Sequence, residues 1–347
     1  GFQGRKQKRI NMLNKPAVKK IEKLLSDALR EGRSSLLEHE AYDVLELAGI
    51  ETPSRFFISN PEEAKAEIPG KVVCKLISPE MIHRTEFGGI KFIEATDENI
   101  KSAFSEFSAI AEKAGVNFSG MLVTEFLEID ESLPRQLILS LRQDRSFGPL
   151  IVMGPGGTGT EIYRENFREE RGLLLAVPET VRERERIEKL LNGNVLFPII
   201  AGKTRISEEP LIDPDRIIEI LEIFAGLAET FSRSSTLSEF TIEELEVNPL
   251  QIKDGKALAL DALLRFSRNK HQIGRKNQDN IKRLLYPENI LMIGASASRH
   301  NMGRQILKNL ARSGDRIKEE DLLALHPDPE VKQIEGVRSI SSLKEID

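Results

Sequence analysis

The sequence has little cysteine and no long apolar run. Its 347 residues include one cysteine, Cys74, which excludes an internal disulfide and any metal site built from several cysteines. No apolar run approaches the ~20 residues that a membrane-spanning helix needs, and the N-terminus has no apolar signal-like core. These absences predict a soluble cytoplasmic protein that does not associate with a membrane.

An excess of basic charge is also missing. Lys and Arg number 50 against 55 Asp and Glu, a formal net charge of −5, so no general positive field predicts nucleic-acid binding. We interpret the basic residues among the first twenty positions as a solvated arm. With 39% hydrophobic and 30% charged residues and no low-complexity tract, the chain has the composition of a folded protein of two or three domains.

Helical and strand-like periods alternate along most of the chain. Apolar residues at helical spacing predict helices over 17–29, 35–49, 98–115, 178–193 and 214–233. The second has Ser35 as its N-cap, Glu38 three residues later in a capping box, and Gly49 at its end. A short helix is predicted over 60–68. Apolar runs bounded by turn residues predict strands over 55–59, 71–77, 120–128, 135–144 and 148–154, and a hairpin over 240–264 turned at 254–255.

A polar, basic stretch divides the sequence. After it, a strand, a small-residue turn, a helix and a second strand over 287–327 form the start of a βαβ unit, about 60 residues before the last residue. The predicted organisation is an N-terminal arm and helix (1–32), a main domain (33–266), a linker (267–284) and a partial second domain (285–347).

Glycines follow the strand over 148–154. Gly154, Gly156 and Gly159 satisfy G-x-G-x-x-G, the glycine spacing that is typical of a dinucleotide-binding site. The strands before it look like hairpin-linked neighbours, and the threonines at 158 and 160 are poor helix formers, so we favour a loop whose backbone N–H groups approach a phosphate. A tight turn without a ligand is the alternative.

Two further positions have the chemistry of a phosphate site. In the hairpin over 240–264, Glu246, Asn248 and Asp261 alternate along paired strands, and oxygen ligands of this kind suit Mg²⁺. The simpler interpretation of the same pattern is a solvent-exposed face of the sheet that binds no metal. Lys75 lies in an apolar strand, where an ammonium is costly unless it meets an anion.

Four motifs occur in a fixed order: "VVCKLISPEMIHRTEFGGI", "FGPLIVMGPGG", "ELEVNPL" and "LDALL". Together they resemble the ATP-grasp domain of the ADP-forming acyl-CoA synthetases, relatives of succinyl-CoA synthetase, over roughly residues 33 to 265. The stretch "PENILMIGASASRHNMGRQILKNLARSG" resembles the start of the CoA-binding domain of the same enzymes. The resemblance implies an α/β chain with an ATP-grasp fold, two α+β subdomains around a nucleotide cleft, followed by a partial Rossmann-like domain.

The resemblance also implies a site. It implies binding of ATP or ADP by Lys75, Glu125, Phe126, Gly156 and Gly157. It implies Mg²⁺ at Asn248 and Asp261, and contacts with coenzyme A at Gly294, Ala295, Ser296 and Gly303. The further expected partners are a small carboxylic acid and the remaining synthetase domains, in a longer chain or a partner subunit, within an oligomer.

His83 stands on a polar loop after the strand over 71–77 and before a glycine pair. The resemblance implies that it carries a phosphoryl group between the nucleotide and a second, swivelling histidine domain, and a neutral imidazole is a competent nucleophile for this. A histidine that only hydrogen-bonds locally is the alternative. The corresponding functions are an ADP-forming acyl-CoA synthetase, a non-catalytic nucleotide- and CoA-sensing module, or, from the glycines at 154, 156 and 159, an NAD-dependent oxidoreductase.

Overall fold

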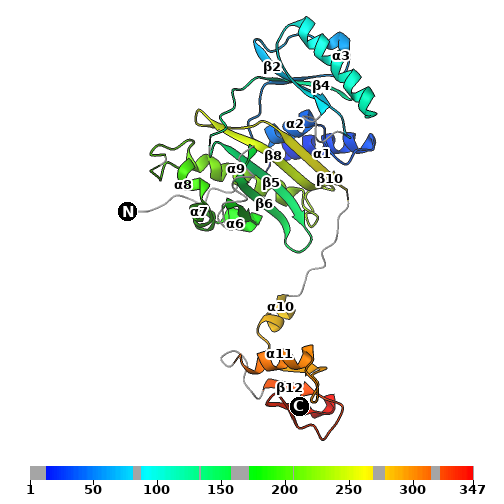
Figure 1. Cartoon of the computed structure of the whole chain (residues 1–347), viewed down its shortest axis with the longest axis vertical. Helices are drawn as coiled ribbons and strands as arrows, with labels where there is room; N and C mark the ends of the chain where they lie inside the picture. The colour runs from blue at the N-terminus through cyan, green and yellow to red at the C-terminus, as the bar shows by residue number, and fades with distance from the viewer. Residues whose placement is uncertain are drawn as a thin grey trace. The chain divides into compact units, whose positions relative to one another are not determined.

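The structure, a computed structural model, describes residues 13–80, 87–132, 134–157, 172–205, 207–268, 278–313 and 321–346. The chain divides into two compact units, residues 1–272 and 273–347 (Figure 1). The first unit contains two sheets and most of the helices. It holds almost all of the predicted nucleotide site.

The smaller sheet of the first unit has four antiparallel strands in the order β1-β4-β2-β3. Its elements are β1 (Arg55–Ile58), β2 (Lys71–Ile77), β3 (Ile90–Glu94), β4 (Gly120–Glu125) and the helix α3 (Asp97–Ala114). Helix α3 covers one face of this sheet, where Cys74 and Leu76 of β2 pack against Phe107. Because side chains alternate along a strand, Lys75 points to the opposite face.

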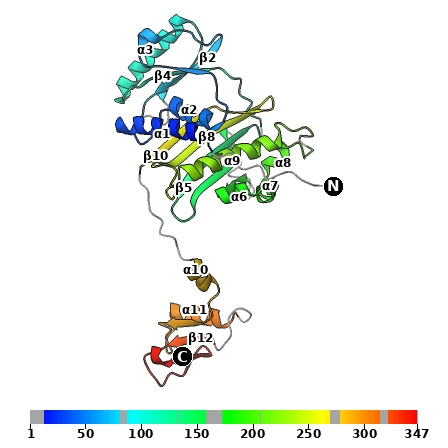
Figure 2. The same cartoon turned by 180° about the vertical axis from the view of Figure 1, so that it is seen from behind.

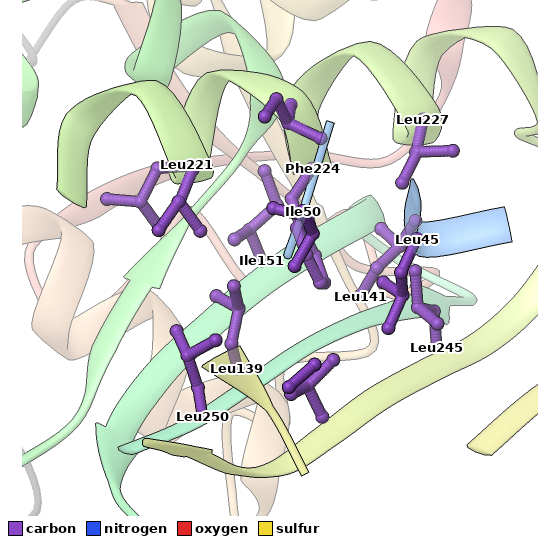
Figure 3. Packing of buried hydrophobic residues seen from close by; sticks show 14 of the residues in the cluster. Leu45, Ile50, Leu139, Leu141, Ile151, Leu221, Phe224, Leu227, Leu245 and Leu250 are labelled. Carbon is purple, nitrogen blue, oxygen red and sulfur yellow. The ribbon is translucent and has the colours of Figure 1, made fainter. Parts of the chain in front are cut away.

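The larger sheet has the order β10-β8-β5-β6-β7, with β9 paired to the far end of β8. Its strands are β5 (Gln136–Asp144), β6 (Gly148–Pro155), β7 (Leu174–Ala176), β8 (Thr241–Lys253), β9 (Lys256–Ala259) and β10 (Ala262–Ser267). The helix α9 (Pro214–Thr230) lies across one face (Figure 2). There Leu221 and Phe224 pack with Leu139, Leu141 and Leu245, all buried (Figure 3).

The predicted hairpin is confirmed. Strands β8 and β9 pair through a turn at Asp254 and Gly255, whose φ angles of 50° and 74° match the left-handed conformation that an Asp-Gly pair favours in such turns. Beyond Leu260 the chain continues as β10 and pairs with the first half of β8. The break between β9 and β10 therefore stands opposite Asn248 and Pro249, which are joined by a cis peptide bond.

Two helices, α1 (Lys15–Arg30) and α2 (Glu38–Ala48), add their apolar faces to the core of the larger sheet. The prediction that Ser35 caps α2 is wrong, because Ser35 forms a β-bridge with Arg265 and the helix begins only at Glu38. The cap position is Leu37, whose N–H donates to the carboxylate of Glu40 at 2.7 Å. Gly49 ends the helix in the left-handed conformation, as predicted.

Two other predicted helices differ in detail. The single helix predicted over 178–193 is divided at Glu183 into α6 (Pro178–Arg182) and α7 (Arg184–Gly193), followed by α8 (Leu196–Ile200). The short helix predicted over 60–68 is reduced to a 3-10 turn, Pro61–Glu63. The sequence "PEEAKAEIPG" gives it little apolar surface to bury, so packing does not extend the turn.

The second unit has a four-stranded sheet in the order β11-β12-β14-β13. Its elements are α10 (Gln278–Leu285), β11 (Ile290–Ile293), α11 (Met302–Ala311), β12 (Leu322–Leu325), β13 (Gln333–Ile334) and β14 (Val337–Ile340). Strands β11, β12 and β14 are parallel, and α11 packs on them through Leu307. This is a partial Rossmann-like arrangement, and α10 occupies part of the segment that was predicted as a linker. None of the helices in the described ranges combines the length and apolarity required to cross a membrane.

Candidate nucleotide and metal site

A glycine turn follows β6. The N–H of Gly156 donates to the carbonyl of Gln136 at 2.9 Å, and the N–H of Gly157 donates to Oδ1 of Asn248 at 3.0 Å. A Cβ on Gly156 would lie 2.3 Å from the backbone carbon of Leu137, and one on Gly157 would lie 1.5 Å from Oε1 of Gln136. The φ of Gly157 is +63°. Position 156 therefore requires glycine because the backbone of Leu137 approaches it closely, and position 157 because of its left-handed backbone, with the Gln136 side chain also in the way.

The glycine turn does not belong to a dinucleotide-binding βαβ unit. Strand β6 is antiparallel to both of its neighbours, β5 and β7, whereas the fingerprint requires a parallel sheet. Gly159, the last glycine of the motif, lies outside the described residues. The turn is held next to Asn248 instead, which brings two of the four sequence motifs together.

The predicted metal residues are neighbours. The N–H of Asn248 donates to the backbone carbonyl of Asp261 at 3.3 Å, so the two residues stand opposite each other where β9 gives way to β10. Asn248 is half-buried and Asp261 is exposed. Glu246 shares the polar face of β8 and lies 3.5 Å from Arg142.

This pair of oxygen donors fits Mg²⁺. The ion usually takes one or two protein ligands and completes its shell with water and phosphate oxygens. No group of three or more His, Cys, Asp or Glu side chains suited to a metal occurs among the described residues, so these residues offer no all-protein cage. An amide and a carboxylate beside the glycine turn match the needs of a metal that arrives with a nucleotide.

The anion that Lys75 meets is a carboxylate of the protein. Its Nζ lies 2.5 Å from Oε1 of Glu38, 3.0 Å from the carbonyl oxygen of Leu260 and 3.4 Å from the hydroxyl of Tyr42. The Tyr42 hydroxyl is in turn 2.6 Å from the Leu260 carbonyl and 2.9 Å from the same Glu38 oxygen. We name these four residues the Lys75 network.

Three members of the Lys75 network are buried, and the fourth, Leu260, is half-buried. The Glu38 side chain has no exposed surface, the Lys75 side chain is 11% exposed, and Tyr42 is fully buried. The sequence showed that Lys75 needed an anion but did not identify Glu38, which had been assigned to a helix cap. The arrangement joins β2 of the smaller sheet, α2 and the end of β9 at one point.

The segment predicted to contact adenine follows β4. The N–H of Glu125 donates to the carbonyl of Ser54 at 2.9 Å, and its carboxylate accepts the Ser54 N–H at 2.8 Å. The N–H of Phe126 donates to the carbonyl of Lys71, whose ammonium lies 4.3 Å from the centre of the Phe126 ring. Because both N–H groups already donate to backbone carbonyls of the protein, a backbone N–H that binds a purine would have to come from a later residue of this segment.

His83 lies outside the described residues. The strands before and after it in the sequence are β2 and β3, which are antiparallel neighbours. The N–H of Leu76 donates to the carbonyl of Gly89 at 2.8 Å, and Gly88 has a φ of +72°. His83 therefore follows, in the sequence, the same strand that carries Lys75.

The turn predicted to bind coenzyme A is in the second unit. Gly294 has a φ of +88°, Ala295 is buried, and a Cβ on Gly303 would lie 2.5 Å from the Gly294 carbonyl. Asn301, which sequence reasoning missed, holds this turn: its Nδ2 donates to the Gly294 carbonyl at 2.8 Å, and its Oδ1 accepts the N–H of Ser296 at 3.3 Å. An Asn just before a helix is a capping signal, so its role was readable from the sequence.

Comparison with known proteins identifies the fold family. The model of an ATP-grasp domain matches residues 27–266, more than half of the chain, and the chain belongs to this family. The predicted resemblance is thereby confirmed. The beta subunit of an ADP-forming acetate–CoA ligase I from Pyrococcus furiosus is 29% identical over 254 residues, 71% of this chain and 97% of that subunit. An ADP-forming acetate–CoA ligase II from Archaeoglobus fulgidus is 25% identical, over 80% of this chain but 37% of that protein.

Solved structures agree with this placement. The dinucleotide-forming acetyl-coenzyme A synthetase 1 of Candidatus Korarchaeum cryptofilum was solved with coenzyme A, acetyl-coenzyme A and a phosphorylated phosphohistidine segment. It superposes with a TM-score of 0.55 at 26% identity, over 71% of this chain and all of that one. The same synthetase with coenzyme A and Mg-AMPPCP gives a TM-score of 0.53. The chain thus has the ATP-grasp fold of ADP-forming CoA ligases.

Proposed function

We propose that this chain supplies the nucleotide-binding part of an ADP-forming acyl-CoA synthetase, which converts a carboxylate, coenzyme A and ATP into acyl-CoA, ADP and phosphate. The observation that carries the proposal is the hydrogen bond from the Gly157 N–H to Asn248, next to Asp261. It joins a phosphate-covering turn to two oxygen donors. The family membership and the relatives named above support the reaction class.

In the proposed reaction, backbone and side-chain groups of the first unit position the nucleotide. Gly156 and Gly157 cover its phosphates, and Glu125 and Phe126 border the adenine. Lys75 is proposed to face the phosphates from β2. Mg²⁺, held by Asn248 and Asp261, would neutralise phosphate charge when bound.

His83 is the proposed phosphoryl carrier. A ring nitrogen attacks the γ-phosphorus of ATP, the new N–P bond replaces the bond to the bridging oxygen, and ADP leaves with that oxygen. The phosphoryl group then passes to the further domains, where it forms an acyl phosphate from the carboxylate, and coenzyme A displaces phosphate from it. Gly294, Ala295, Ser296 and Gly303 are proposed to contact coenzyme A in the second unit.

The remaining domains are proposed to come from a longer chain or from a partner subunit. The relatives show both arrangements, since the chain spans 97% of one beta subunit and 37% of a larger ligase. Acetate is the acid that both of these proteins name. We propose a small carboxylic acid as the substrate class and an oligomer as the assembly.

The test is the intact mass of the protein after incubation with Mg²⁺ and ATP. We expect one acid-labile phosphoryl group, which His83→Ala abolishes. His300→Ala is the matched control, because His300 is exposed in the second unit and should leave the labelling unchanged. Calorimetry of ATP binding accompanies the mass measurement. A protein that binds ATP but never gains the phosphoryl group contradicts the synthetase and favours the sensing module.

A further inference from the structure

The Lys75 network acts on one particular peptide group. Nζ of Lys75 and the hydroxyl of Tyr42 converge on the carbonyl oxygen of Leu260, at 3.0 and 2.6 Å. That carbonyl belongs to the planar peptide unit that joins Leu260 to Asp261. Two donors that fix the direction of this C=O also fix the plane of the peptide unit. They thereby fix the orientation of the Asp261 backbone N–H and Cα, which lie in that plane. The network therefore reaches the proposed metal ligand through its backbone.

Glu38 keeps both donors in place. Its Oε1 lies 2.5 Å from Lys75 Nζ and 2.9 Å from the Tyr42 hydroxyl, so the ammonium and the hydroxyl stand side by side on one carboxylate oxygen. The ammonium has three N–H groups and three partners at hydrogen-bonding distance. It can donate to a phosphate only by leaving one of them.

The hydroxyl of Tyr42 has one proton for two acceptors, the Leu260 carbonyl and the Glu38 carboxylate. Its oxygen also lies within reach of the Lys75 ammonium. It therefore links the Leu260 carbonyl, the Glu38 carboxylate and the Lys75 ammonium. The ring of Tyr42 packs in the core independently of the hydroxyl, so the two contributions are separable by substitution.

We propose that Glu38 and Tyr42 are positioning residues that orient the Leu260–Asp261 peptide group, so that the Asp261 carboxylate and the Asn248 amide face the same Mg²⁺. The proposal rests on the proposed function, because it assumes that this pair holds the metal. It adds a role for two residues of α2, a helix that contributes none of the predicted ligands. The same contacts link Lys75 on β2 to the metal position.

The primary test is Tyr42→Phe, which removes the hydroxyl and keeps the ring. Tyr286→Phe is the matched control, since Tyr286 is 76% exposed in the second unit. Binding of ADP is measured by calorimetry with Mg²⁺ and with EDTA. Mn²⁺ binding in the presence of ADP is measured by electron paramagnetic resonance, and thermal melting reports the fold.

We expect Tyr42→Phe to weaken Mn²⁺ binding and Mg²⁺-dependent ADP binding by about 10-fold, the usual size of the effect when a residue that orients a metal ligand is removed. Binding of ADP in EDTA should be unchanged, and Tyr286→Phe should match the wild type. Equal losses with and without metal overturn the proposal, because they indicate general damage to the cleft. Unchanged Mn²⁺ binding overturns it as well.

Two further variants keep the test decisive. Glu38→Gln keeps the size of the side chain and removes its charge, so it should lower metal affinity in the same direction even if Tyr42→Phe folds poorly. Asp261→Asn tests the metal site itself. If Asp261→Asn has no effect on Mn²⁺ binding, the proposed function is at fault. If it weakens binding while Tyr42→Phe and Glu38→Gln do not, the positioning role alone is refuted.

Discussion

Replacing Gly157 by alanine would place a methyl carbon 1.5 Å from Oε1 of Gln136, in a residue whose φ is +63°. The left-handed backbone costs a residue with a Cβ ~1–2 kcal/mol. Forcing the nearly buried Gln136 side chain aside costs ~1–3 kcal/mol more. We therefore expect Gly157→Ala to lower the free energy of unfolding by about 2–5 kcal/mol.

The steric part of this cost should depend on Gln136. In the double variant Gly157→Ala with Gln136→Ala, the overlapping side chain is gone and the backbone cost remains. Urea unfolding followed by circular dichroism should then give a coupling energy of about 1–3 kcal/mol between the two positions. ATP affinity should fall in Gly157→Ala, because the clash with Gln136 displaces the N–H that Gly157 donates to Asn248.

Gly156→Ala is the matched control. Its Cβ would meet the backbone carbon of Leu137 at 2.3 Å, which truncation of Gln136 does not remove. We therefore expect that Gln136→Ala does not reduce the destabilisation caused by Gly156→Ala. If the free-energy losses of Gly157→Ala and Gln136→Ala add to within about 0.5 kcal/mol, the close contact is not what selects glycine at 157, and the reasoning is refuted.

Three other predictions follow from described positions. Burial lowers the pKa of His39, whose ring stacks on Phe57, so its stabilising contribution is present above the unfolded pKa of about 6.5 and is lost as pH falls below it. Urea unfolding at about pH 7.5 and 5.5 measures how much the free energy of unfolding falls between the two pH values. This decrease should be smaller for His39→Phe than for the wild type, and an equal decrease would contradict the reasoning. Burial raises the pKa of the Cys74 thiol to about 12, so alkylation at neutral pH should require denaturant, and rapid reaction of the folded protein would disprove the burial. Gly303→Ala should weaken binding of coenzyme A measured by calorimetry, because its Cβ would lie 2.5 Å from the Gly294 carbonyl; unchanged affinity would place coenzyme A elsewhere.

Much of the fold could be predicted from local patterns in the sequence. Apolar runs bounded by turn residues located β2 and β8, and the Asp254-Gly255 pair located the turn between β8 and β9, because both residues adopt positive φ. The order of the motifs then identified the ATP-grasp family. These features depend on neighbours in the sequence, which is why the sequence alone was sufficient for them.

Contacts between distant segments were not predictable in the same way. Lys75 is 37 residues from Glu38 and 185 from Leu260, so no local pattern connects them. Ser35 followed by Glu38 looked like a capping box, yet Ser35 pairs with Arg265 across the fold. Tertiary pairing overrode the local preference there. It also left Glu38 available to Lys75.

The hydrogen bond between Gly157 and Asn248 has a thermodynamic consequence. Oδ1 of Asn248 accepts the N–H that fixes the glycine turn. If the same oxygen is also a ligand of Mg²⁺, the position of the turn and the binding of the metal are linked by a free energy of coupling. Such coupling is reciprocal. Whatever factor the metal adds to the affinity for the nucleotide phosphates, the phosphates add to the affinity for the metal, so nucleotide and cation would be taken up and released as a single unit.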